Sequence, residues 1–300
     1  MERSIFNTKN KFWQRVQSNV LFVAFAELLI IIGSIRLLVR PLYRNVDFFE
    51  AVFGPEYAQD FHMYFWYFIP LAVSILFMRL TCRGVLKVFT EGSKKRKLGS
   101  AGKGLLLGCV INCIPTLCSA LTGGITFRFN RVTPMLLPLF VLVFIQCCSE
   151  EFMLRGYVPA VLGTGHKWDT VAFVSGVLFI FHHIGNMEML GFNAIFCLNV
   201  FLVGVMLVLL VKKDGNFWIC CGFHCGWNFT QQFVMGLPNS GLSSNISIVQ
   251  GEAASDTFFF NTVYGNEGAL CTTLVTVVMI ILLIDMTAKD KGKEITLQAS

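Results

Sequence analysis

Long apolar segments recur along the whole chain, and they constrain its fold more than any other feature. A transmembrane helix needs about 20 consecutive, mostly apolar residues. Eight segments qualify or nearly do, at residues 20–39, 62–79, 104–122, 134–155, 169–184, 192–211, 217–236 and 268–286. We therefore expect an all-α polytopic membrane helix bundle of about eight transmembrane helices.

The composition supports an integral membrane protein. Hydrophobic residues make up 55% of the 300 residues, and charged residues make up 14%, against about 25% in soluble domains. Mean hydropathy is +0.64. We expect no cleavable signal peptide, because the first apolar run begins near Val20, is too long for a signal core and lacks a small-x-small exit. The sequence thus predicts a multi-pass protein of the cell membrane.

Basic residues cluster between alternate apolar segments. The four clusters are Arg3, Lys9, Lys11 and Arg15; Arg83, Lys87 and residues 94–97; Lys212 and Lys213; and Lys289, Lys291 and Lys293. Because lysine and arginine collect in cytoplasmic loops, this pattern predicts that both termini are cytoplasmic. The clusters also account for the net charge of +6, so the charge gives no reason to expect a nucleic acid partner.

The chain divides into three parts on these grounds. Residues 1–100 hold an N-terminal cytoplasmic segment, the first two spans and a basic linker at 91–103. Residues 101–240 form a helical core with the main polar sites that lie within apolar runs. Residues 241–300 hold the rest of an external loop (237–267), the last span and a cytoplasmic tail.

Two acids and an arginine stand out at the end of the fourth apolar segment. Charged residues at membrane depth are costly, so they indicate function. On a helix, Glu151 and Arg155 are four residues apart and can pair on one face, whereas Glu150 points about 100° away. Glu150 is then free to act as a general base. The alternative is a charged cluster at the membrane boundary, with Arg155 facing the inner surface.

Two later segments carry histidines inside apolar runs. His183 follows His182, which we expect at the membrane interface. His224 and Asn228 share one face of the seventh segment, and Gly226 between them allows another helix to approach closely. These side chains could simply be interhelical hydrogen-bonding pairs.

Together, the acid, the two imidazoles and the carboxamide could surround one water molecule. The acid would take its proton, and His224 and Asn228 could donate to an oxyanion. Glu150, His183 and His224 could instead bind zinc, although the H-E-x-x-H pattern is absent. The 11 cysteines are most simply small hydrophobic residues at helix contacts. Cys221 and Cys225 flank His224, so a thiol nucleophile or ligand is a further alternative.

Three motifs in order resemble one known family. E-E-x-x-x-R at Glu150–Arg155, F-x-x-x-H at Phe179–His183 and H-x-x-x-N at His224–Asn228 are similar to the motifs of the CAAX protease and bacteriocin-processing (CPBP) family. Its members are intramembrane endopeptidases. The flanking residues resemble bacterial members, and the similarity covers about residues 100–240.

The resemblance implies a role for each residue. Glu150 would activate water, and His183 would hold or polarise it. His224 and Asn228 would stabilise the tetrahedral oxyanion, while Glu151 would pair with Arg155 and support the site. The implied activity is that of a glutamic endopeptidase without a cofactor, with zinc left open. Its partners would be the lipid bilayer and a peptide or protein substrate with a membrane-anchored segment.

A shared water molecule requires Glu150 and His183 to lie at one depth. If the fourth helix ended at Arg155, Glu150 would lie only about 7 Å from the inner surface, against about 20 Å for His183. We therefore expect this helix to continue through residues 157–162, with Arg155 buried and Pro159 at a kink.

Two other functions are compatible with the sequence. A non-proteolytic bacteriocin-immunity or scaffold protein could carry the same motifs. A small-solute transporter could also use intramembrane charges, but such proteins usually show repeats or paired broken helices, and the sequence shows neither.

Overall fold

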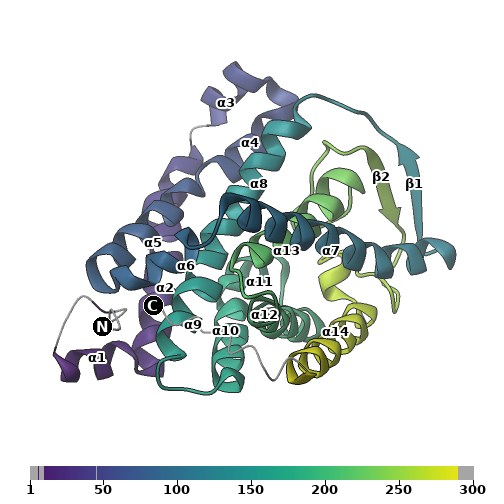
Figure 1. Cartoon of the computed structure of the whole chain (residues 1–300). Helices are drawn as coiled ribbons and strands as arrows, with labels where there is room; N and C mark the ends of the chain where they lie inside the picture. Colours follow the sequence, from purple (N-terminus) through teal and green to yellow (C-terminus); the bar gives the residue numbers. More distant parts are fainter. Residues whose placement is uncertain (1–5, 7–9, 45, 290–300) are drawn as a thin grey trace.

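The computed structural model describes residues 6, 10–44 and 46–289 (Figure 1). Of the basic clusters, Arg3, Lys9, Lys291 and Lys293 lie outside the described residues. Within the described part, seven helices are long and apolar enough to cross a membrane. They span Val20–Leu42, Pro55–Thr81, Lys94–Leu121, Leu136–Leu162, Trp168–Leu190, Ala194–Asp214 and Leu270–Lys289. The expectation of an all-α polytopic bundle is confirmed.

The N-terminal part supplies the first two of these spans. Its helices are α1 (Lys11–Gln17), α2 (Val20–Ser34), α3 (Val46–Phe53), α4 (Pro55–Phe65), α5 (Phe68–Thr81) and α6 (Leu86–Thr90). The side chain of Asn19 caps α2 by accepting hydrogen bonds from the backbone N–H groups of Leu21 and Phe22, which fixes where the first span begins. Beyond Ser34, α2 continues through a π-helical turn.

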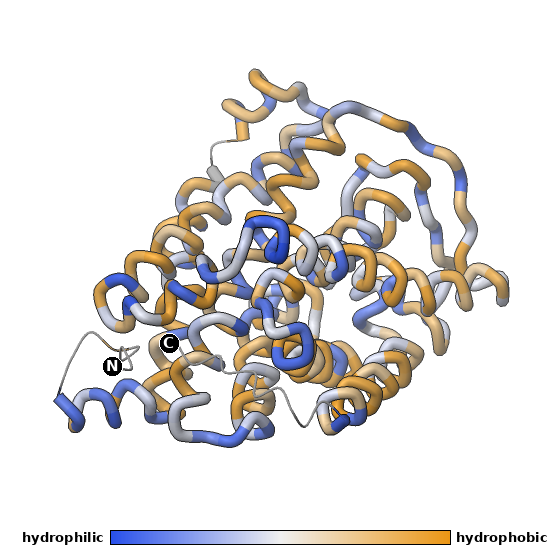
Figure 2. Tube along the Cα trace, viewed as in Figure 1, coloured by the Kyte–Doolittle hydropathy of each residue, from blue (hydrophilic) through white to orange (hydrophobic). Residues whose placement is uncertain are grey.

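The remaining spans form the core of the bundle. Its helices are α7 (Lys94–Leu121), α8 (Leu136–Glu151), α9 (Val158–Leu162), α10 (Trp168–His182), α11 (Ile184–Leu190), α12 (Ala194–Asp214), α13 (Trp218–Phe229) and α14 (Leu270–Lys289). Hydrophobic residues run along most of these helices, and hydrophilic residues gather at several of their ends and connections (Figure 2). Leu21 and Leu121 are 79% and 87% exposed, as expected of side chains that face lipid.

Two boundaries differ from the sequence prediction. The basic stretch at 91–103 is not an irregular linker, because α7 begins at Lys94, where the Ser93 hydroxyl accepts a hydrogen bond from the Arg96 N–H. The predicted seventh span, at 217–236, forms α13 and a π-helical turn, Thr230–Val234, and this helix is shorter than the seven membrane-spanning helices.

Glycines bring α7 and α13 into very close contact. A Cβ atom added at Gly226 would lie 2.2 Å from the Leu105 carbonyl oxygen, and one added at Gly108 would lie 2.1 Å from the Phe223 carbonyl oxygen. Gly104 and Gly222 meet the partner backbone in the same way. The two small-xxx-small patterns therefore let the helix backbones touch, and this contact sets the position of α13.

The structure also contains a two-stranded antiparallel sheet that was not predicted from the sequence. β1 (Ile125–Phe129) pairs with β2 (Val249–Ala253), and both lie at one side of the bundle (Figure 1). The predicted external loop, residues 237–267, packs back onto the helices, since Phe260 and Tyr264 are buried. β2 lies within this loop and is far from β1 in the sequence, so local sequence patterns do not predict the pairing.

Candidate active site

The helix that carries the two acids continues past them, as predicted. α8 passes through a π-helical turn, Phe152–Tyr157, into α9 without a break. Pro159 has no backbone N–H, so it cannot donate the α-helical hydrogen bond to the carbonyl of Arg155. The wider π-helical turn contains Arg155. Arg155 is completely buried, so the cluster does not face the inner surface.

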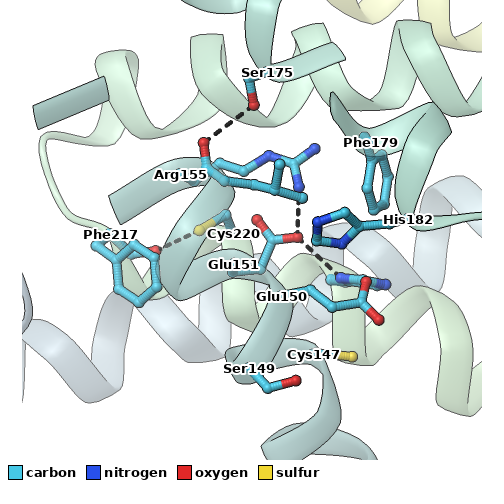
Figure 3. Close-up of polar contacts among 12 residues, drawn as sticks. Cys147, Ser149, Glu150, Glu151, Arg155, Ser175, Phe179, His182, Phe217 and Cys220 are labelled. Atoms are coloured by element: carbon cyan, nitrogen blue, oxygen red, sulfur yellow. Dashed lines mark hydrogen bonds and ion pairs between the residues drawn. The ribbon is translucent and has the colours of Figure 1, made fainter. Parts of the chain in front are cut away.

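Glu151 joins Arg155 to the second histidine. Its Oε1 atom lies 2.9 Å from Nη1 of Arg155 and 3.0 Å from Nδ1 of His224. Glu151 points towards Arg155, while Glu150 points away from the guanidinium (Figure 3). Both members of the Glu151–Arg155 pair are fully buried, so breaking it by removing one partner would leave an uncompensated charge. The predicted pairing is present, and the bond to His224 adds to it.

Phe179 organises this cluster from α10. The Arg155 guanidinium carbon lies 4.4 Å from the centroid of the Phe179 ring, in the range of a cation–π contact. The backbone carbonyl of Phe179 accepts a 2.9 Å hydrogen bond from Nδ1 of His183. Because a carbonyl only accepts, Nδ1 carries the proton and Nε2 of a neutral His183 is left as an acceptor.

Gln146 connects the candidate base, Glu150, to the carboxamide of Asn228, and it was not among the residues predicted from the sequence. Its Nε2 donates a 2.6 Å hydrogen bond to Oε1 of Glu150, and its Oε1 accepts a 3.4 Å hydrogen bond from Nδ2 of Asn228. Gln146 lies four residues before Glu150 and hence on the same helix face. Gln146 is an amide within an apolar run, and this feature of the sequence could have identified it as a candidate site residue.

One cavity brings the predicted reaction-centre residues together. Glu150, His183, His224 and Asn228 all line it, and its empty volume is about 680 Å³, counting the part open to the surroundings. Gln146 lines the same cavity. The side chains come from α8, α13 and the junction of α10 with α11, so their approach is a product of the tertiary fold.

The expectation that His182 is a simple interfacial residue is wrong. Its side chain is 3% exposed, and its Nε2 lies 2.5 Å from Oε1 of Glu27, which is fully buried on α2. His182 also lines the cavity that holds Glu150. Glu27 is a single acid within the first apolar run, and the rule that marked Glu150 could have marked it too.

The residues proposed as alternative ligands or nucleophiles do not gather as a metal site. Among the residues that the structure describes, no group of three or more His, Cys, Asp and Glu side chains could hold a metal ion. Glu150, His183 and His224 share the cavity but do not form such a group, so we derive no step through a metal. Cys221 and Cys225 are buried free thiols, and they are not among the residues that line this cavity.

Comparison with known proteins agrees with the three motifs. The family model described as "Type II CAAX prenyl endopeptidase Rce1-like" matches residues 132–230, which include all four candidate reaction-centre residues. No curated protein and no solved structure matches the chain. The match confirms the CAAX protease resemblance of the motifs: the chain is a multi-pass membrane protein, and its residues 132–230 are similar to the Rce1-like type II CAAX prenyl endopeptidases.

Proposed function

We propose that this protein is an intramembrane endopeptidase that hydrolyses a peptide bond of a membrane-associated peptide or protein, with Glu150 as the base. One observation carries the proposal: Glu150, His183, His224 and Asn228 line a single cavity although they come from three separate parts of the chain. The family match supports it independently, because the match spans all four residues.

Glu150 and His183 have the hydrogen-bonding capacity to hold a water molecule. Oε1 of Glu150 accepts from Gln146, which leaves Oε2 for water. Nε2 of a neutral His183 is an acceptor, since its Nδ1 proton is used by the Phe179 carbonyl. A water molecule that donates to both acceptors would turn a lone pair towards a substrate carbonyl carbon, as general-base catalysis needs.

His224 and Asn228 can supply the donors for the oxyanion. Nδ1 of His224 donates to Glu151, so the form of His224 that could bind an oxyanion is the imidazolium, in which Nε2–H is the second donor. Nδ2 of Asn228 has a second proton beyond the one it gives to Gln146. Donors fixed in this way stabilise charge that develops in the transition state.

The proposed steps balance as follows. Water oxygen bonds to the carbonyl carbon while Glu150 takes one water proton, and the carbonyl becomes an oxyanion held by His224 and Asn228. The intermediate collapses, the carbon–nitrogen bond breaks, and the proton on Glu150 passes to the departing amine. The products are a carboxylic acid and an amine, and Glu150 returns to its carboxylate form. The proposal uses no cofactor.

The test compares Glu150→Gln with wild type on farnesylated CAAX peptides in lipid vesicles, a probe that the family name suggests. Loss of the base should lower kcat by about 10²- to 10⁴-fold. Glu188→Gln is the control, because Glu188 is an exposed carboxylate paired with Arg36, and it should keep wild-type activity. Unchanged turnover in a folded Glu150→Gln protein would exclude Glu150 as the base. A folded wild type that cleaves none of the peptides would favour the immunity or scaffold role instead. Activity that is lost on EDTA treatment and restored by zinc would overturn the cofactor-free form.

A further inference from the structure

A buried acid–imidazole pair reaches the cavity of the reaction centre and has no part in the proposed steps. Nε2 of His182 lies 2.5 Å from Oε1 of Glu27 on α2, and both side chains are buried. His182 lines the same cavity as Glu150 and His183. Neither member of the pair is a defined position of the three motifs, and Glu27 lies outside the matched residues 132–230.

The pair holds one acidic proton. Glu27 is fully buried within the first span, and a buried carboxylate without a neutralising partner is costly. A neutral pair is either a carboxylate with an imidazolium or a carboxylic acid with a neutral imidazole. In the first form, both ring nitrogens of His182 carry protons. In the second, Glu27 donates to Nε2, and the ring proton is on Nδ1. Nδ1 of His182 is therefore protonated in both forms.

This Nδ1–H group is a donor without an acceptor in the part of the chain that the structure describes. The Nδ1 atom is buried and makes no hydrogen bond there. A buried donor with no partner is costly, so a polar atom of a bound substrate would be a favourable acceptor. Two further charged groups, Glu150 and Arg155, lie near enough to interact electrostatically with His182 (Figure 3). The donor is thus close to the candidate base.

Hydrolysis of a peptide bond needs a proton donor as well as a base. The amine leaves the tetrahedral intermediate once its nitrogen gains a proton. In the proposed steps, Glu150 takes a proton from water and also delivers it to the amine. A separate donor in the same cavity would divide these two tasks between two groups, each in the protonation state that its task requires.

We propose that His182, held by Glu27, is the proton donor to the departing amine. The inference rests on the proposed endopeptidase function and replaces one of its proton transfers. The Nδ1 proton moves to the amine nitrogen as the carbon–nitrogen bond breaks, which leaves Nε2–H donating to the Glu27 carboxylate. The carboxylic acid of Glu150 then returns its proton to Nδ1, so the products and the proton balance are unchanged. His182 is then a catalytic residue and Glu27 a positioning residue.

The test compares two leaving groups in one peptide. The probes are a farnesylated CAAX peptide in lipid vesicles and the same peptide with a thioester in place of the scissile amide. A thiolate leaves without a proton, because the pKa of a thiol is only about 8.5, whereas an amine needs one. The variants are His182→Gln and Glu27→Gln. The control is His166→Gln, since His166 is an exposed histidine between α9 and α10.

We expect both variants to lower kcat for the amide by about 10²-fold or more and to leave kcat for the thioester near the wild-type value. His166→Gln should match wild type on both probes. An unfolded fraction lowers both rates alike, so the ratio of the two rates reports the proton transfer even in a variant that folds poorly.

Equal loss on both probes, or no loss on either, overturns His182 as the proton donor. The endopeptidase function stands in that case if wild type cleaves both probes and Glu150→Gln slows both. A wild type that cleaves neither probe overturns both proposals.

Discussion

Nδ1 of His224 lies 3.0 Å from Oε1 of Glu151, the same oxygen that pairs with Arg155 at 2.9 Å. A single carboxylate oxygen thus links α8 to α13 and orients the imidazole in the cavity. Glu151 therefore positions a residue of the proposed oxyanion site and does more than neutralise Arg155.

Glu151→Gln should lower kcat with little change in KM. The variant keeps the size of the side chain but removes the negative charge beside Nδ1 of His224. Because the interaction matters most when the oxyanion forms, we expect a fall of about 10²-fold in kcat. Steady-state kinetics in vesicles measure both constants. An increase in KM with unchanged kcat would contradict the positioning role.

Arg155→Leu should unfold the protein more readily. It leaves the buried Glu151 carboxylate with His224 alone, and breaking a buried ion pair costs about 3–5 kcal/mol. The control is Arg36→Leu, because its ion pair with Glu188 is exposed and contributes at most about 1 kcal/mol. Thermal unfolding in detergent compares the two. Equal melting temperatures would show that the Glu151–Arg155 pair contributes no more than the exposed one.

Gln146→Leu should reduce turnover without a large loss of folded protein. It removes the hydrogen bonds to Glu150 and Asn228, each of which is worth about 1 kcal/mol. The combined loss corresponds to about 30-fold in kcat. Gln146→Glu distinguishes orientation from packing, since a second carboxylate would repel Glu150 and should lower activity further. Wild-type kinetics in Gln146→Leu would exclude Gln146 from orienting the base.

Gly226→Ala should destabilise the bundle by about 1–3 kcal/mol, although alanine favours helices. The added Cβ would lie 2.2 Å from the Leu105 carbonyl oxygen, so α7 and α13 must separate. Gly102→Ala on α7 is the matched control, because nothing lies within 4 Å of its added Cβ, and it should be neutral or slightly stabilising. Melting temperatures that rise in both variants would refute the close contact.

The stability contributed by Glu267 should depend on pH. Burial raises the pKa of Glu267 above its usual 4.5, against the opposing effect of its hydrogen bonds with Trp227 and Gln231. Between 4.5 and the raised pKa, the unfolded chain binds fewer protons at this group than the folded protein. Its contribution to the free energy of unfolding therefore falls as pH rises through this window. Wild type should therefore lose stability relative to Glu267→Gln as the pH rises from 4.5, as measured by melting. A difference that is independent of pH would contradict the raised pKa.

Local sequence patterns were sufficient for several parts of this structure. Apolar length predicted the spans, and the four-residue spacing of Glu151 and Arg155 predicted their ion pair. The depth argument also predicted that the fourth helix continues beyond Arg155. These features depend on residues close together in the chain, where helix geometry fixes which side chains meet.

Other contacts were not predictable, because they join distant segments. Glu27 meets His182 across 155 residues, and Gln146 meets Asn228 across 82. β1 and β2 are likewise separated by most of the core, and no turn signal connects them. In each case, a polar group needed a partner within an apolar bundle, but the sequence did not specify which one.

The sequence by itself determined a membrane bundle, the ion pair of Glu151 with Arg155, and a resemblance to the motifs of CAAX proteases. Only the tertiary structure decided that His224 bonds to Glu151, that Glu150 and Asn228 line one cavity with the two histidines His183 and His224, and that the His182 side chain lies against α2. The physical reason is that helix periodicity sets the face on which a side chain lies. The packing of helices, here through the glycines of α7 and α13, sets which faces meet.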